Sequence, residues 1–156
     1  MINLIGTYEC TLDSKGRILL PAGIKKQIDS LLQEGFVLKR SVFQPCLELH
    51  PMVEWNQTMY KINKLNRFVK KNNDFIRQFT AGLKNVDIDS NGRLQISKDL
   101  IRFAKLEKDI VVASALNVIE IWDKSLYENA VNVNDEDFAK LAEDVMGNML
   151  YDNELP

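Results

Sequence analysis

Residues 12–20 read Leu-Asp-Ser-Lys-Gly-Arg-Ile-Leu-Leu, and residues 88–96 read Ile-Asp-Ser-Asn-Gly-Arg-Leu-Gln-Ile. At this constant offset of 76 residues, Asp, Ser, Gly and Arg are identical, and three apolar positions are matched. A second similarity joins residues 47–50, Leu-Glu-Leu-His, to residues 119–122, Ile-Glu-Ile-Trp, at an offset of 72. The chain therefore contains an internal duplication, which is typical of a structural repeat.

Each copy predicts a strand, a tight turn, a second strand, a short helix and two further strands. Residues 7–12 alternate between apolar and polar types, as a half-buried strand does. The next four residues place Asp13 first and Gly16 fourth in a type I turn, and Gly16 can then adopt the left-handed conformation of a bulge. Asp89 and Gly92 occupy the same places in the second copy.

The segments between and after the two copies predict helices. Apolar residues recur at helical spacing in residues 55–65 and again in residues 68–79. Residues 138–149 predict an amphipathic helix whose polar face is acidic. No Gly/Ser linker separates the copies, so we expect the two repeats to share one core.

Charge is distributed unevenly along the chain. The formal net charge is −2, but residues 132–156 carry −6, which leaves +4 on residues 1–131. Residues 61–84 hold seven basic side chains against the single acid Asp74. This pattern fits a solvated helix face followed by an acidic tail, and it also leaves a nucleic-acid partner open.

Composition limits the class of protein. The two cysteines form no CxxC pair, which excludes a disulfide framework and a zinc module. No apolar run reaches the roughly 18–20 residues of a membrane helix, and the N-terminus lacks the pattern of a secretory signal. We therefore expect a cytoplasmic protein without a membrane partner.

Residues 87–92 match the opening of a calcium-binding EF-hand loop, D-x-D-x-N-G. The twelfth position of that loop should be a bidentate Glu, and here it is Lys98. The surrounding segments also predict strands, whereas an EF-hand loop lies between helices. We expect no metal site.

No catalytic motif is present either. The chain lacks G-x-S-x-G, Walker A and G-x-G-x-x-G sequences. His50 precedes a proline at an expected helix start or surface position, and Cys10 is expected to be a buried structural thiol. The repeated carboxylates Glu48 and Glu120 are expected to meet backbone or arginine donors. The sequence indicates neither an enzyme, a cofactor nor a small-molecule substrate.

The duplicated turn places Arg17 and Arg93 in equivalent loops, with Lys15 beside the first arginine. A single copy is compatible with an ordinary hairpin whose arginine lies at the solvated rim. Two copies instead suit duplex DNA, because arginine forms paired hydrogen bonds with guanine and lysine contacts a phosphate or a base.

The duplicated D-x-x-G-R turns, the Arg-Ile-Leu-Leu-Pro-Ala sequence at residues 17–22 and the Ile-Glu-Ile-Trp sequence at residues 119–122 resemble the MraZ family of bacterial transcriptional regulators. That family belongs to the AbrB/MazE swapped-hairpin superfamily. The resemblance extends from Ile5 to Tyr127 and so covers nearly the whole chain except the acidic tail.

The resemblance implies an α+β fold of two tandem AbrB/MazE-like repeats, each a half of a swapped-hairpin β-barrel, related by pseudo-two-fold symmetry. Short helices lie between and after the repeats. We expect repeat 1 at residues 5–50, linking helices at residues 51–80, repeat 2 at residues 81–127, and an acidic amphipathic tail at residues 128–156.

The resemblance also implies partners and site residues. The partners are double-stranded DNA at promoter repeats and further copies of the chain in a ring-like homo-oligomer. The DNA-binding residues are Lys15, Arg17 and Arg93. Asn91 stands where a second lysine would match Lys15, which weakens the expectation of a base contact there. The loop-shaping residues are Asp13, Gly16, Asp89 and Gly92.

The implied function is sequence-specific regulation of transcription by a nucleoid-associated protein, as a repressor of its own operon in the division and cell-wall gene cluster. The alternatives are an antitoxin-like partner protein and a structural, ring-forming interaction protein. Antitoxins of this superfamily usually combine one hairpin domain with a disordered tail, and that organisation differs from the duplication found here.

Overall fold

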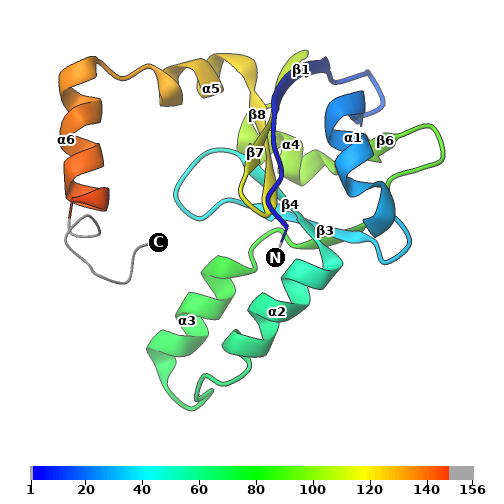
Figure 1. Cartoon of the computed structure of the whole chain (residues 1–156). Helices are drawn as coiled ribbons and strands as arrows, with labels where there is room; N and C mark the ends of the chain where they lie inside the picture. Colours follow the sequence, from blue (N-terminus) through cyan, green and yellow to red (C-terminus); the bar gives the residue numbers. More distant parts are fainter. Residues whose placement is uncertain (1, 148–156) are drawn as a thin grey trace. The chain divides into compact units, whose positions relative to one another are not determined.

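The computed structural model describes residues 2–147 of the 156-residue chain. The chain divides into two compact units, one ending at Leu126 and the other beginning at Tyr127. The strands and helices, drawn in Figure 1, are β1 (Thr7–Thr11), β2 (Arg17–Leu19), α1 (Ala22–Ile28) with a 3-10 turn (Asp29–Leu31), β3 (Phe36–Arg40), β4 (Leu47–Pro51), α2 (Met52–Ile62), α3 (Lys70–Phe79), β5 (Lys84–Val86), β6 (Arg93–Gln95), α4 (Lys98–Ala104), β7 (Asp109–Ala115), β8 (Val118–Asp123), α5 (Lys124–Val131) and α6 (Asp135–Met146).

Six strands form an antiparallel sheet in the order β1-β7-β8-β4-β3-β5. If each strand is replaced by its counterpart in the other repeat (β1 by β5, β3 by β7, β4 by β8), the same order is read backwards. The sheet therefore has a pseudo-two-fold axis between its central strands β4 and β8, where Glu48 lies opposite Glu120.

The first two strands of each repeat pair with strands of the other repeat. Strand β1 pairs with β7, and β5 pairs with β3. The second strands, β2 and β6, pair with each other as a separate two-stranded sheet. Neither repeat completes its own strand pairing, so the predicted α+β fold with two tandem swapped-hairpin repeats is confirmed.

One face of the large sheet forms the apolar core together with α1, α4 and the β2–β6 pair. Ile18 and Leu94 lie opposite each other at the centre of that pair, and both are fully buried. Alternation along β4 buries Leu47 and Leu49 and directs Glu48 to the other face. Burying an aliphatic side chain of this size contributes about 1.5–3 kcal/mol, so these positions hold the two repeats together.

The other face of the sheet carries a buried ionic cluster formed by Lys39, Glu48 and His50. Lys39 is fully buried, and its Nζ donates to Glu48 Oε1 at 3.2 Å and to the carbonyl oxygen of Arg40 at 2.7 Å. His50 Nε2 lies 3.0 Å from the same Glu48 oxygen and donates its proton there, because a carboxylate can only accept.

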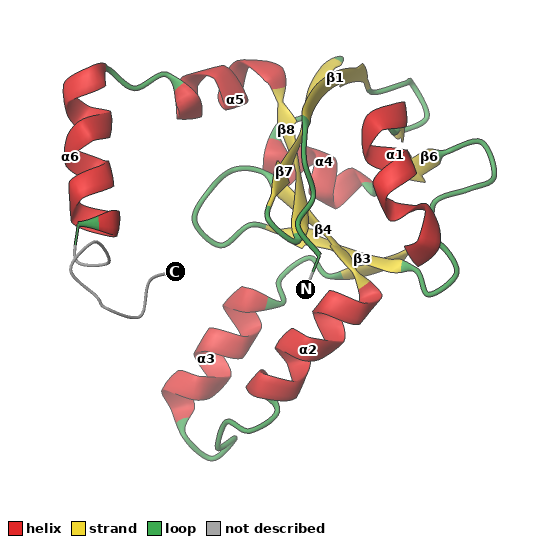
Figure 2. Ribbon diagram, viewed as in Figure 1, coloured by secondary structure: helices red, strands yellow, loops and turns green. Residues whose placement is uncertain are grey.

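Helices α2 and α3 cover this cluster with two aromatic rings. The ring centroids of Trp55 and Phe79 lie 5.8 Å apart in a stacked arrangement. Lys39 Nζ lies 4.7 Å from the centroid of the Phe79 ring, and the His50 ring meets the Trp55 ring edge-on at 5.2 Å. The cluster thus connects the sheet to the two helices that extend away from the strands in Figure 2.

Several local expectations need correction. The carboxylates of Glu48 and Glu120 do not bind arginine: Glu48 binds Lys39 and His50, and Glu120 accepts from the indole N–H of Trp122 at 3.0 Å. His50 precedes α2 as expected but is buried.

The C-terminal helices also differ from expectation. Helix α5 was not among the predicted elements, although its apolar residues Leu126, Tyr127, Ala130 and Val131 recur at helical spacing. The predicted tail helix at residues 138–149 corresponds to α6, Asp135–Met146, and its predicted end lies outside the described residues. Within residues 2–147, no helix has the length and apolar character needed to cross a membrane.

We predict that Glu48→Gln destabilises the protein by about 2–4 kcal/mol, because it leaves the buried Lys39 ammonium without its counter-charge. Adding Lys39→Met should recover most of this loss, since both charges are then removed. Urea unfolding of the two single variants and the double variant measures the coupling. As a control, Asp74→Asn breaks the exposed pairs with Lys70 and Arg77 and should cost less than about 1 kcal/mol.

The same pair predicts a pH dependence. Burial alone would raise the pKa of Glu48, but the His50 hydrogen bond and the Lys39 charge outweigh burial and hold this pKa below its ordinary value of 4.5. The stabilisation is therefore fully present above pH 4.5 and is lost as the pH falls through the lower folded-state pKa. Acid unfolding that is unaltered by Glu48→Gln would contradict this assignment.

Candidate nucleic-acid interface

The first hairpin loop is organised around the carboxylate of Asp13. Its Oδ1 accepts hydrogen bonds from the backbone N–H groups of Lys15 and Arg17, each at 2.9 Å. Its Oδ2 accepts from Arg17 Nε, also at 2.9 Å. Gly16 completes the turn at φ +78°, a left-handed conformation that costs other residues about 1–2 kcal/mol. The loop thus presents Lys15 at its exposed tip and holds Arg17 at its base.

The second hairpin loop repeats the backbone geometry around Asp89. The Oδ1 of Asp89 accepts from the N–H groups of Asn91 and Arg93, each at 2.9 Å. The N–H of Gly92 donates to the carbonyl oxygen of Asp89 at 2.9 Å, and Gly92 has a φ of +80°. The four predicted loop-shaping residues therefore occupy equivalent positions in two equivalent turns.

The electrostatics of the two loops are also alike. Backbone hydrogen bonds, first of all from the N–H of Arg17, hold the pKa of Asp13 below its ordinary value. The N–H of Arg93 does the same for Asp89, and the positive charges of Arg93 and Arg17 lower the pKa of Asp89 further. Both aspartates are therefore ionised at neutral pH. The positive charge of Arg17 therefore lowers the pKa of an aspartate in each of the two loops.

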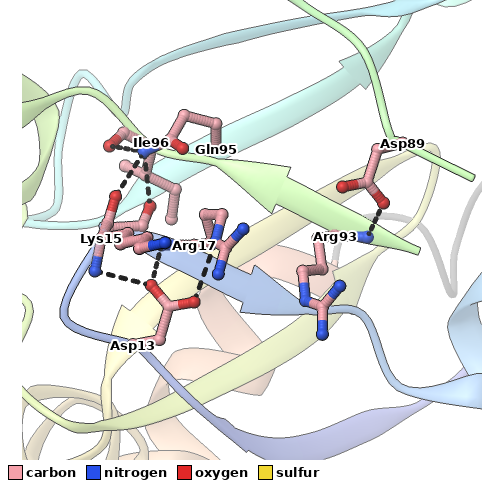
Figure 3. A network of polar contacts seen from close by, with 8 residues as sticks. Asp13, Lys15, Arg17, Asp89, Arg93, Gln95 and Ile96 are labelled. Atoms are coloured by element: carbon pink, nitrogen blue, oxygen red, sulfur yellow. Dashed lines mark hydrogen bonds and ion pairs between the residues drawn. The ribbon is translucent and has the colours of Figure 1, made fainter. Parts of the chain in front are cut away.

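The two arginines differ in how they are held (Figure 3). The Arg17 side chain forms an ion pair with Asp13 and is about one-third exposed. The side chain of Arg93 extends away from Asp89, and among residues 2–147 no hydrogen bond or ion pair holds its guanidinium. The first loop therefore presents a positioned arginine, and the second presents a free one.

A side chain from the second repeat braces the first loop. The amide nitrogen of Gln95 donates to the carbonyl oxygens of Lys15 and Gly16, at 2.8 and 3.3 Å. The symmetry-related position is Leu19, whose side chain has no donor, so the second loop lacks this brace. Sequence reasoning missed Gln95, and the only signal was its alignment with an exposed leucine in the other copy.

The described part of the chain offers neither a reactive thiolate nor a group of metal ligands. Burial raises the pKa of the Cys10 thiol to about 11 and that of Cys46 to about 12, so neither forms a thiolate at neutral pH. Across residues 2–147, no cluster of three or more His, Cys, Asp or Glu side chains could hold a metal ion.

Comparison with known proteins reveals the family. The family model described as "MraZ protein, putative antitoxin-like" matches the chain twice, at residues 4–78 and 79–149. These two matches together span both repeats.

Relatives resemble the chain over almost its whole length. A protein of Christiangramia forsetii is 60% identical over 152 residues, which is 97% of this chain and 98% of the relative. A protein of Flavobacterium psychrophilum is 64% identical over 149 residues, covering 96% and 95%, and one of Cytophaga hutchinsonii is 41% identical over 138 residues, covering 88% and 91%. All three are named transcriptional regulator MraZ.

We predict that Gln95→Leu, which copies the residue at the symmetry-related position, loosens the first loop only. Loss of the side-chain hydrogen bonds should lower the free energy of unfolding by about 0.5–1.5 kcal/mol. Backbone ¹⁵N relaxation should show lower order parameters at Lys15 and Gly16, with Gly92 unchanged. Equal loosening of both loops would show that Gln95 acts on the whole fold and not on one loop.

Proposed function

The chain belongs to the MraZ family, and from this premise we propose that it is a sequence-specific, DNA-binding transcriptional regulator and not an enzyme. The observation that carries the proposal is the pair of equivalent loops on β2 and β6, which place Arg17 and Arg93 on strands that pair with each other. The names of the relatives, transcriptional regulator MraZ, support the same function.

The chemistry of the first loop suits the reading of guanine. Asp13 binds Arg17 through Nε, and no described residue binds the two terminal nitrogens of the guanidinium. These nitrogens can then bond guanine O6 and N7 in the major groove. Lys15, at the exposed tip, is suited to a phosphate or base contact, because an ammonium group acts as a compact point charge.

We assign the DNA-binding role to the two repeats, at residues 5–50 and 81–127, which the helices of residues 51–80 link, and a role in assembly to the acidic tail at residues 128–156. One loop reaches few base pairs, so one subunit binds weakly. A ring-like homo-oligomer on tandem promoter repeats raises affinity through the effective concentration of its loops. In this proposal the protein associates with the nucleoid in the cytoplasm and represses its own operon, in the division and cell-wall gene cluster.

A second candidate function is toxin neutralisation, which the antitoxin-like description of the family favours. The duplication weighs against it, since both hairpins are needed to complete one strand-paired core. The two candidates differ in what they require of the arginines, because a protein partner does not need the ability to bind guanine.

We predict that the Arg17→Ala, Arg93→Ala double variant loses selective binding to the DNA upstream of its own gene. Each lost bidentate contact should cost about 1–3 kcal/mol on that DNA. Fluorescence anisotropy with unrelated competitor DNA measures the selectivity. Arg102→Ala removes an exposed arginine of α4 outside both loops and is the matched control. Equal binding by wild type and double variant would reject the proposed function.

We predict further that the full chain has a solution mass several times its subunit mass of 17.9 kDa. Light scattering during gel filtration measures this directly. A chain ending at Val131 tests the tail, whose apolar residues Phe138, Leu141 and Val145 are exposed in α6. A monomeric full chain would refute the ring, and an unchanged assembly of the shortened chain would refute a role for the tail.

A further inference from the structure

The sequence of the first loop contains one more positive charge than the sequence of the second loop. The first loop contains Lys15 two residues before its arginine, and the second contains Asn91 at the equivalent position. Because the fold has pseudo-two-fold symmetry, the two loops would bind equivalent stretches of DNA backbone. The second loop then lacks a cation that the first loop supplies from its own tip.

A lysine from the other repeat lies against the second loop. A Cβ atom on Gly92 would lie 3.1 Å from both Cδ and Nζ of Lys25, which belongs to α1. At the symmetry-related place, a Cβ on Gly16 would lie 3.3 Å from Cδ1 of Ile101, in α4. Gly92 is consequently buried, whereas Gly16 is partly exposed. The lysine stem covers the second loop and leaves a cationic nitrogen beside it.

Lys25 and Asn91 face the same hollow on the surface. They line a cavity of about 530 Å³ together with Leu19, which is the strand partner of Arg93. Glu9 also lines the cavity, but its carboxylate is paired with Lys124 at 2.6 Å. Within residues 2–147, no carboxylate forms an ion pair with Lys25. Its charge is thus available to an external anion.

We propose that Lys25 binds a backbone phosphate of duplex DNA on behalf of the second loop and so replaces the lysine that Asn91 lacks. This proposal rests on the proposed DNA-binding function. A lysine suits a phosphate better than a base edge, because its ammonium is a point charge on a flexible stem. Each DNA-contacting site then contains one lysine and one arginine, and the second site combines residues of both repeats.

The test compares Lys25→Met with Lys26→Met, in the full-length protein. Methionine keeps the apolar stem over Gly92 and removes the charge, and Lys26 is an exposed neighbour in the same helix. Both variants should retain the unfolding temperature of the wild type. Binding is measured between about 0.05 and 0.3 M salt, on the DNA upstream of the gene and on a scrambled duplex.

Lys25→Met should weaken binding to both duplexes about five-fold at 0.15 M salt and reduce the slope of log K against log salt by about one for each engaged second loop. Lys26→Met should leave both quantities unchanged. The Lys25→Met, Asn91→Lys double variant should restore the slope, because it returns the cation to the place that Lys15 occupies in the first loop.

The outcomes separate this inference from the function on which it rests. If Lys25→Met binds like the wild type while Arg93→Ala does not, the role of Lys25 is overturned and the regulator function stands. Equal weakening by Lys25→Met and Lys26→Met would also overturn it, because the effect would then be one of general charge. If the wild type does not select its upstream DNA, both proposals fail.

Discussion

The pairing of β2 with β6 is the constraint on which the rest of the structure depends. Each strand has only three residues, and an isolated two-stranded sheet of that length is not stable in water. It persists because Ile18 and Leu94, opposite each other at its centre, enter the common core with no exposed surface. Because the two strands are antiparallel, the loops that lead into them lie at opposite ends of the pair, and their spacing is determined by the core and not by the loops themselves.

The symmetry also imposes a cost at the central strands. The axis brings the carboxylates Glu48 and Glu120 opposite each other, and like charges so placed are destabilising. Each carboxylate has its own donor: Glu48 binds the buried Lys39 ammonium and His50, and Glu120 binds the Trp122 indole. Because Lys39 also lies beneath the Phe79 ring, relief of this repulsion ties the linking helices to the sheet.

Sequence periodicity and turn chemistry predicted the repeats, their strands, the linking helices and the four loop-shaping residues, because each of these follows from local preference or from the 76-residue offset. The contacts of Gln95 and Lys25 with the opposite loops could not be predicted in this way. Both join residues of different repeats, so they exist only once the hairpins have exchanged. The Lys39 partner of Glu48 lies within the same repeat and was missed for another reason, because cross-strand register is a property of the assembled sheet.

The divergence of the two copies bears on how such a protein meets DNA. Two identical loops related by a two-fold axis would bind a site equally well in either orientation. Any preference for one orientation must arise from residues that differ between the copies, and the structure gathers these at the loops: Lys15 against Asn91, Gln95 against Leu19, and Lys25 against Ile101. The first loop is braced and holds its arginine, whereas the guanidinium of Arg93 has no hydrogen-bond or ion-pair partner among residues 2–147. A pseudo-symmetric scaffold whose loops bind DNA as proposed thereby gains a direction along the duplex, which two identical loops would not provide.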